Sequence, residues 1–349
     1  MSENKHLTPV WIVYVDGRRL DVEHEGALQS ITVSDALNGI SAFSLVFDTA
    51  EVKVREKGLF SFESEVSIHL GYKDDVEEVF RGEALEFRGV YPENGAEQLE
   101  ITGCSALHRL GHGTRYRSYE NKTPSEIIKG ILDGYSLKGE VEEISASHEF
   151  ESEENMSDYD YVLEQAKAHG KQLYADGSTV YVKAEVAVRN DEIIYEWGKS
   201  LKSFEAAQDI SVLLSGVEYI GWDSLKNESF TGSAELGDVP VKVGGGSDWS
   251  AVSKGGNGKY VEVRVDMNCK DADEAKKLAA GRLQNNSYAF GYARGLAEGD
   301  YKLRPGMRVV VKAVGEAFEG EYMAEAVTHR FDRRNGYSSE FTLKRNMIP

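Results

Sequence analysis

The pattern of apolar and polar positions predicts strands at both ends of the chain and helices near its middle. Residues 8 to about 110, and again from about 193, alternate between apolar and polar positions over short runs separated by glycine, asparagine and aspartate. Regularly spaced short strands of this kind are typical of a sandwich or a barrel. Asp16-Gly17, between two apolar runs, predicts a tight hairpin. Because most runs alternate, we expect each sheet to have one buried face and one solvent-exposed face.

One strand pattern occurs twice. The stretch "VFRGEALEFRGVYPENGAEQLEITG" resembles "AFEGEYMAEAVTHRFDRRNGYSSEFTLKR" close to the end, and the strand-like runs "EVSIHL" and "RVVVKAV" lie upstream of the two copies. The matched positions are Phe80, Gly82, Glu83 and Asn94-Gly95 in the first copy and Phe318, Gly320, Glu321 and Asn335-Gly336 in the second. Internal similarity of this kind predicts that the chain builds one β unit two times.

Between residues 111 and 190 the spacing becomes helical. Thr123 and Glu126 form a capping box around the start of one helix, and Ser157 caps a second helix. Asp176-Gly177 predicts a hairpin after it. The acidic stretch 139–160 is expected to be solvated. These features predict a small α+β module, and a further helix is expected after Asp271, within the second β region.

The net charge limits the kinds of partner that the protein surface can bind. The 349 residues carry 59 acidic and 40 basic side chains, a formal net charge of -19. Such a surface repels nucleic acid and anionic membranes. The charge serves either solubility alone or an acidic conduit through which a polyanion slides without sticking. No apolar run is long enough to span a bilayer, and the start lacks a signal-peptide layout, so we expect synthesis in the cytoplasm.

Candidate chemistry is sparse. His108 and His112 have a helical metal-site spacing, but Gly111 and Gly113 interrupt the helix and no third ligand is apparent. The run "GGNGKY" lacks the remaining positions of a phosphate-binding loop, and "DMNCKDADE" lacks those of a calcium loop. Chance pairs of carboxylates could lie at glycosidase separation. We therefore expect no catalytic, metal or cofactor site.

Several strings carry a family resemblance. They are "YDYVLEQAKAHGKQLYADGSTVYV", "GVEYIGWDS" and the closing block from "GYARGLAEGDYKLRPGM" to "TLKRN", and their marker residues are Gly221, Trp222, Asp223, Gly295, Leu303, Pro305, Gly306, Phe318, Gly320, Tyr322 and His329. Together they resemble the late-control protein D group of phage tail hub proteins, which is similar to the hub part of type VI secretion spikes and of contractile injection systems. The resemblance is strong over 157–346, whereas the first 110 residues match only in general pattern.

The resemblance implies a mainly β fold with an α+β insertion. Its expected parts are a first tube-like β-barrel domain over 1–110, a helical and hairpin module over 111–190, and a second tube-like β-barrel domain over 191–349 with a long Gly/Ser-rich loop at 242–259. The marker residues are expected to be structural.

It also implies a non-enzymatic baseplate hub without cofactors. Three chains would form a ring that adapts a hexameric tail tube to a trimeric spike on a separate polypeptide, beside other baseplate proteins. DNA or protein cargo would pass through its channel without specific binding, and the hub itself would bind no membrane. Such a hub is assembled into a phage tail, a tailocin or a similar injection particle. A tail-associated cell-wall hydrolase and a surface-binding adhesin are the alternatives.

Overall fold

The structure is a computed structural model that describes residues 8–49, 58–73, 75–145, 148–186, 192–251, 253, 260–266 and 268–349. The prediction of a mainly β chain with an α+β insertion is confirmed. No helix in these ranges is both long and apolar enough to cross a membrane.

The first β unit holds the N-terminal strands. The Asp16-Gly17 hairpin forms as predicted, with positive φ at both residues. The elements are β1 (Pro9–Val15), β2 (Arg18–Arg19), α1 (Val22–Ala27), β3 (Leu28–Ala36), β4 (Ala42–Asp48), β5 (Glu65–Tyr72), β6 (Asp75–Val90), β7 (Gln98–Cys104) and the 3-10 helix η1 (Ala106–Gly111).

The α+β module follows. Thr123 and Glu126 form the predicted capping box, and the Ser157 side chain caps the next helix by accepting from the Asp160 amide. The elements are β8 (Arg115–Lys122), α2 (Pro124–Gly134), β9 (Lys138–Val141), β10 (His148–Met156), α3 (Asp158–Ala168), β11 (Gln172–Asp176) and β12 (Thr179–Lys183).

The second β unit holds the remaining strands and an insertion. Its sheet strands are β13 (Ile193–Glu196), β14 (Leu201–Gln208), β18 (Gly291–Glu298), β19 (Arg308–Lys312), β20 (Gly320–Asp332) and β21 (Gly336–Arg345). Between β14 and β18 lie β15 (Gly216–Asp223), β16 (Glu228–Glu235), η2 (Leu236–Asp238), η3 (Trp249–Ala251), β17 (Val261–Val265) and α4 (Ala272–Ser287). We call the separate sheet β16-β15-β17 the arm.

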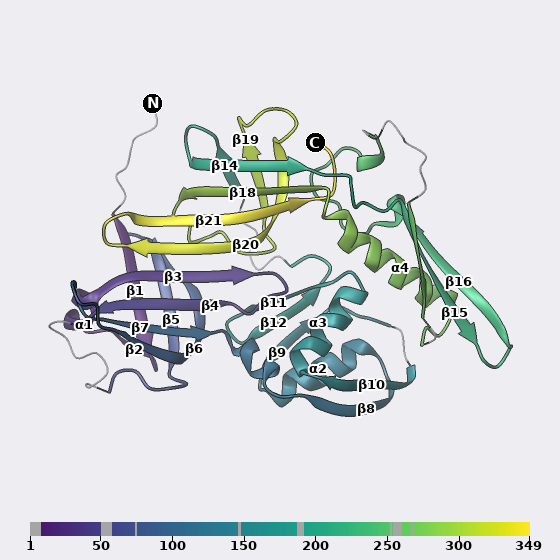
Figure 1. Cartoon of the computed structure of the whole chain (residues 1–349), viewed down its shortest axis with the longest axis horizontal. Coiled ribbons are helices and arrows are strands. Elements are labelled where there is room, and N and C mark those ends of the chain that lie inside the picture. The colour runs from purple at the N-terminus through teal and green to yellow at the C-terminus, as the bar shows by residue number, and fades with distance from the viewer. Residues whose placement is uncertain are drawn as a thin grey trace.

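One continuous sheet runs through both β units. Its strand order is β14-β18-β21-β20-β3-β4-β7-β6-β5-β1-β2, and β19 and β13 branch from β20. Figure 1 shows the strands from β14 down to β6 as a stack, with the module below and the arm projecting to one side. The two units meet where β20 pairs antiparallel with β3, from Ala326–Ala36 to Asp332–Ser30. Because one sheet runs through both β units, the predicted division into three domains stays a prediction.

The strand order confirms the sequence repeat. The order β3-β4-β7-β6-β5 in the first unit recurs as β14-β18-β21-β20-β19 in the second, with every pair antiparallel. The matched Asn-Gly pairs lie at the β6–β7 and β20–β21 turns, as predicted, with Gly336 the first residue of β21. The bulges of these hairpins align Ala84 with Ala324. The structural alignment therefore differs from the sequence match of Gly82 with Gly320 by two residues. Because this number is even, each side chain stays on the same face of the strand in both alignments.

Each unit curls around its own core. One cluster is built from the first unit and takes in Tyr301, Phe331 and Tyr337 of the second, a second cluster fills the module, and a third fills the second unit. No ladder in the described ranges closes either unit into a barrel, although a single bridge joins Trp197 to Leu201 in the second.

Two details differ from the sequence prediction. The stretch 139–160 is not simply solvated, because it forms β10 and the start of α3, and the Glu153 and Asp158 side chains are fully buried against arginines of β8. Of the predicted loop at 242–259, residue 252 and residues 254–259 lie outside the described part of the chain.

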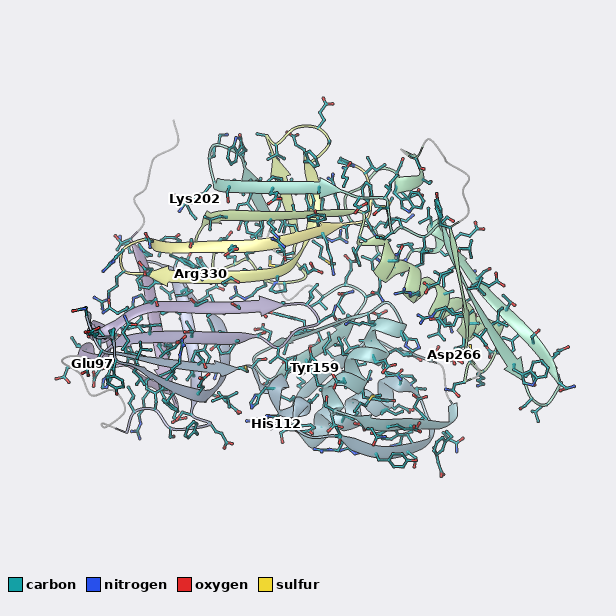
Figure 2. The ribbon with its side chains drawn as sticks, in the orientation of Figure 1. Glu97, His112, Tyr159, Lys202, Asp266 and Arg330 are labelled. Atoms are coloured by element: carbon teal, nitrogen blue, oxygen red, sulfur yellow. The ribbon has the colours of Figure 1, made fainter. Side chains whose placement is uncertain are left out.

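A buried carboxyl ties the first unit to the module. Asp35 on β3 accepts from the Ser41 hydroxyl at 2.5 Å and from the Tyr174 hydroxyl, on β11, at 2.6 Å. Burial raises the pKa of Asp35 and of Tyr174. Tyr159, labelled in Figure 2, donates to the Asn38 carbonyl at 3.1 Å.

We predict that Tyr174→Phe lowers the free energy of unfolding by about 1–3 kcal/mol, because Asp35 loses a donor that no water replaces. Urea unfolding would measure the change. Tyr116→Phe is the matched control, since Tyr116 is 75% exposed. Equal stability of the two variants would show that the Asp35 contact contributes nothing.

Candidate functional site

Most of the marker residues lie in the second β unit and pack against one another. Gly295 on β18 faces Phe341, and a Cβ at Gly295 would come within 2.4 Å of the Phe341 ring. That ring stacks on Tyr195 with centroids 4.8 Å apart. Glycine therefore leaves the space in which this aromatic pair lies flat against the strand.

The loop between β18 and β19 is held by Gly306. Its φ is +85°, and a Cβ would come within 2.0 Å of the Val186 carbonyl oxygen. Its amide donates to the Ala324 carbonyl at 2.8 Å. Pro305 precedes this turn, and Leu303 is fully buried in the core of the second unit. The Leu-x-Pro-Gly marker thus fixes a loop against the module and β20.

His329 on β20 is a buried, neutral ring. Its Nε2 lies 3.2 Å from the Leu303 carbonyl oxygen, which can only accept, so the proton is on Nε2. Nδ1 then accepts from the Tyr337 hydroxyl at 2.9 Å. Burial and the positive charge of Arg304 lower the pKa of His329 to about 3. The ring fixes the loop in place and is closed to a substrate, since only 1% of it is exposed.

Arg304 joins the two β units, and the marker set did not include it. Its guanidinium donates to the Tyr301 carbonyl at 2.5 Å, the Leu303 carbonyl at 2.9 Å and, across the junction, the Glu78 carbonyl of β6 at 2.8 Å. The side chain is 4% exposed. The only signal in the sequence is a charged residue within an otherwise buried stretch, which gives no partner.

Tyr322, Phe318 and Gly320 surround a buried arginine. The Tyr322 hydroxyl donates to the Phe318 carbonyl at 2.8 Å, and the Arg345 guanidinium lies 4.5 Å from the centre of the Tyr322 ring. Arg345 also donates to the Glu319 carbonyl at 2.9 Å and to the Ala317 carbonyl. Gly320 has a φ of +107°, so the chain bends there as it enters β20.

The Gly-Trp-Asp marker lies apart from the others, at the tip of the arm. A Cβ at Gly221 would come within 2.3 Å of the Phe230 ring on β16. Trp222 is 40% exposed. Asp223 accepts from the Leu225 and Lys226 amides at 3.0 Å and so shapes the β15–β16 turn. The fold does not bring this marker to the closing block.

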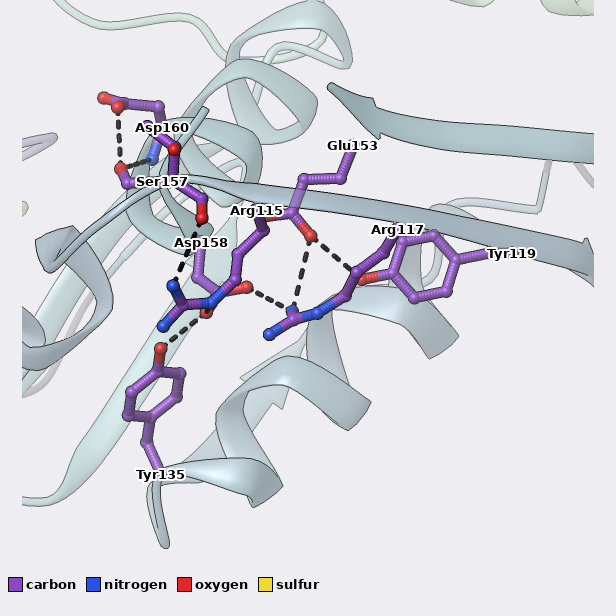
Figure 3. A network of polar contacts seen from close by, with 9 residues as sticks. Arg115, Arg117, Tyr119, Tyr135, Glu153, Ser157, Asp158 and Asp160 are labelled. Carbon is purple, nitrogen blue, oxygen red and sulfur yellow. Dashed lines mark hydrogen bonds and ion pairs between the residues drawn. The ribbon is translucent and has the colours of Figure 1, made fainter. Parts of the chain in front are cut away.

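The densest polar network lies in the module (Figure 3). Arg117 of β8 contacts Asp158 at 2.5 Å and Glu153 at 3.4 Å. Tyr135, after α2, donates to Asp158 at 2.5 Å, and Tyr119 donates to Glu153 at 3.1 Å. Asp158 is the first residue of α3, where the helix dipole favours a negative charge.

The chemistry of this network is that of a structural ion cluster. Burial and the charge of Asp158 raise the pKa of Glu153. A raised carboxyl pKa suits a general acid, but both carboxylate side chains are fully buried and both contact Arg117 (Figure 3). A groove of about 450 Å³ between α2 and β8 reaches Arg117, Tyr119 and Tyr135, but not the two carboxylates.

A groove of about 870 Å³ lies where α3 and α4 face the arm. Its lining mixes acidic and basic side chains, among them Asp160, Glu164, Lys167, Arg264 and Arg282. Within the described ranges, no group of His, Cys, Asp and Glu side chains is arranged to hold a metal ion. His108 and His112 lie with ring centres 5.5 Å apart near Glu83, to which Arg109 is already bound.

We predict that acid destabilises the protein through His329. Its folded pKa of about 3 lies below its ordinary value of 6.5. The unfolded chain therefore binds the proton more readily, so the stabilisation is complete above pH 6.5 and is lost as pH falls toward 3. At pH 5 the loss is about 2 kcal/mol. His329→Gln should flatten this part of the pH profile of unfolding, whereas His112→Gln, at an exposed position, should follow the wild type. A His329→Gln profile as steep as the wild type would contradict the assignment.

We also predict that Gly320→Val lowers the free energy of unfolding by about 1–3 kcal/mol, because valine is strained at positive φ. Gly111→Val is the control, since Gly111 has neither a positive φ nor an atom within 4 Å of its would-be Cβ. Thermal unfolding would compare the two. An undisturbed Gly320→Val variant would mean that the bend before β20 is not required.

The fold is shared with tail proteins. A 43 kDa tail protein of prophage MuSo2 from Shewanella oneidensis is similar with a TM-score of 0.68 and 12% identity, over 98% of this chain and 100% of that one. A tail protein from Neisseria meningitidis MC58 is similar with a TM-score of 0.70 and 11% identity, over 97% of each chain. The E. coli c3393 protein, described as a component of the type VI secretion system, is similar with a TM-score of 0.62 and 10% identity, over 97% of this chain and 79% of that one.

These similarities confirm the predicted resemblance to the tail hub fold. A search of curated proteins by sequence finds no match. One family model, described as the Alg8 N-terminal domain, matches residues 5–332. The chain therefore belongs to the Alg8 N-terminal domain family.

Proposed function

We propose that this protein is the structural hub of a phage tail or of a phage-tail-like contractile injection system. The observation that carries the proposal is the repeated strand order, whose two copies are joined edge to edge by the β20–β3 ladder. The fold shared with tail proteins and with a type VI secretion component supports the same role.

The repeat suits a change of symmetry. A chain with two equivalent units presents six of them when three chains form a closed ring. Such a ring offers similar contacts six times around the axis to a hexameric tail tube. The module and the arm occur once in each chain, so they repeat three times and match a trimeric spike. Other baseplate proteins would contact the outside of the assembled particle.

The charge suits a channel. With a net charge of -19, the chain repels polyanions in general. DNA, or a protein cargo, would then pass through the centre of the ring without specific binding. Assembly would occur after synthesis in the cytoplasm, and no membrane attachment is part of the role.

The proposal includes no enzymatic activity. The paired carboxylates of the module are buried and bound to arginine and tyrosine, an arrangement that stabilises structure. A cell-wall hydrolase needs an acid and a second carboxylate that face a substrate across the scissile bond. An adhesin would not need two copies of one unit joined by their edges.

Light scattering of the purified chain should give a mass of three copies, with or without a trimeric spike protein present. A large, obligate interface buries on the order of 2,000 Å² or more, so the trimer should persist on dilution. A chain that stays monomeric under both conditions would overturn the proposal.

A turbidity assay on purified cell walls separates the hub from a hydrolase. The expected result is no clearing by the wild type beyond that of a buffer control. Clearing by the wild type beyond that of the buffer control would instead establish the hydrolase.

A further inference from the structure

We propose that the outer half of β6 pairs antiparallel with β14 of a second copy of this chain, in the register of the internal β20–β3 ladder. This inference rests on the proposed function, because it names the contact that would join the hub subunits. It follows from the repeat: β6 corresponds to β20, and β14 corresponds to β3.

The internal ladder provides the template. The first part of β20 pairs with β19, and its second part, from Ala326 to Asp332, pairs with β3 of the other unit. In the first unit, the first part of β6 likewise pairs with β5, up to Glu83. The second part of β6, however, pairs only with β7 among the described strands.

The matching edge is on β14. Among the described strands β14 pairs only with β18, apart from the single bridge between Leu201 and Trp197. Its counterpart β3 has partners on both sides. In Figure 1, β14 and β6 lie on opposite sides of the stack of strands, so one chain cannot join them to each other. A strand edge left without a partner is a template for pairing with another chain.

Bulges define the correspondence residue by residue. Ala84 in β6 and Ala324 in β20 precede equivalent bulges opposite their hairpin partners. Gln29 in β3 has no partner in the ladder with β4, where the register shifts between Leu28 and Ser30. Lys202 in β14 likewise has no partner in the ladder with β18, where the register shifts between Leu201 and Ser203. Figure 2 marks Lys202 at the start of β14. Both strands of the proposed ladder are therefore aligned to the template independently.

This alignment fixes the register. In the template, Thr328 pairs with Ser34, His329 with Val33 and Phe331 with Ile31. The equivalent pairs between two copies are Arg88 with Ala207, Gly89 with Ala206, and Tyr91 with Phe204.

Side chains at these positions support a covered interface. Phe331 lies against Trp11 of the neighbouring unit, with ring centres 6.0 Å apart, and is 8% exposed. Its equivalent, Tyr91, is 75% exposed. Pairing with a second copy would place Tyr91 beside Phe204, at the edge of the core of the second unit. A large aromatic side chain would thereby gain the burial that its counterpart already has.

Further exposed apolar residues flank both edges. Phe62 contacts Phe87 of β6, with ring centres 5.0 Å apart, and is 62% exposed. Around β14, Trp197, Ile210 and Val212 are also exposed. Apolar side chains gathered beside two unpaired edges indicate surfaces that another protein covers. Because each edge differs from the other, the contact is head to tail and can close into a ring.

Cysteine cross-linking tests the register. In a background in which Cys104 and Cys269 are replaced by alanine, Arg88→Cys together with Ala207→Cys should form intermolecular disulfides on mild oxidation, seen as dimers and trimers on a non-reducing gel. The matched control, Arg88→Cys with Ser203→Cys, displaces the second thiol along the same face by about 13 Å, beyond disulfide reach. It should remain largely uncross-linked.

Light scattering of the same samples separates this inference from the function on which it rests. A trimer in which neither pair cross-links, or in which the displaced pair cross-links as well as the aligned pair, overturns the β6–β14 ladder and leaves the hub intact. A monomer that does not cross-link overturns both.

A second variant tests the aromatic contact. Tyr91→Glu should weaken association between chains by roughly tenfold or more, because a charge would be buried at the interface. Leu225→Glu is the control, since Leu225 is 97% exposed at the tip of the arm. Circular dichroism would verify that both variants fold. Equal association of the two variants would contradict the placement of Tyr91.

Discussion

The antiparallel ladder between β20 and β3 is the contact on which the architecture depends. It converts two curled β units into one sheet, and the side chains around it make the junction rigid. Arg304 donates to the Glu78 carbonyl, Arg333 donates to the Leu28 carbonyl at 2.6 Å, and the Tyr72 hydroxyl donates to the Gly299 carbonyl at 2.8 Å. All three bonds cross from one unit to the other and end on backbone carbonyls. A junction held through the backbone is insensitive to the identity of the accepting residue.

Several buried ionic groups lie at or near places where parts of the chain meet. Asp35 lies between the first unit and the module, Arg304 between the two units, and Arg345 beneath the entry to β20. Asp35 and Arg304 are each bound by several partners, which offsets the cost of removing a charge from water. Since removal of one partner leaves the others unpaired, these sites favour a single relative placement of the parts. In the proposed ring this uniqueness would matter, because an error in the angle between the two units would accumulate around the ring.

Local signals and the internal repeat were read correctly from the sequence, whereas the contacts between distant segments were not. The Asp16-Gly17 turn, the Thr123 capping box and the hairpins around the two Asn-Gly pairs depend on adjacent residues, and all of them form. The β20–β3 pairing could not be predicted, since either edge could accept any strand of suitable length. The solvated character expected for 139–160 holds for most of its described residues but not for Glu153 and Asp158, because the arginines that bury them lie on a different strand. The markers of the closing block lie together in the second unit, whereas Gly221, Trp222 and Asp223 lie on the arm. Arg304 lies within the closing block, but nothing in the sequence indicates its partner on β6.

The insertion between β14 and β18 has a consequence for how this architecture can diversify. In the first unit the equivalent strands, β3 and β4, are joined by a short connection, whereas in the second the arm and α4 occupy the same place. Closing a longer loop costs little more entropy than closing a short one. Further residues can therefore be inserted between these two strands without altering a strand, its register or an edge of the sheet. Insertions at this position can therefore change during evolution while the main sheet stays the same.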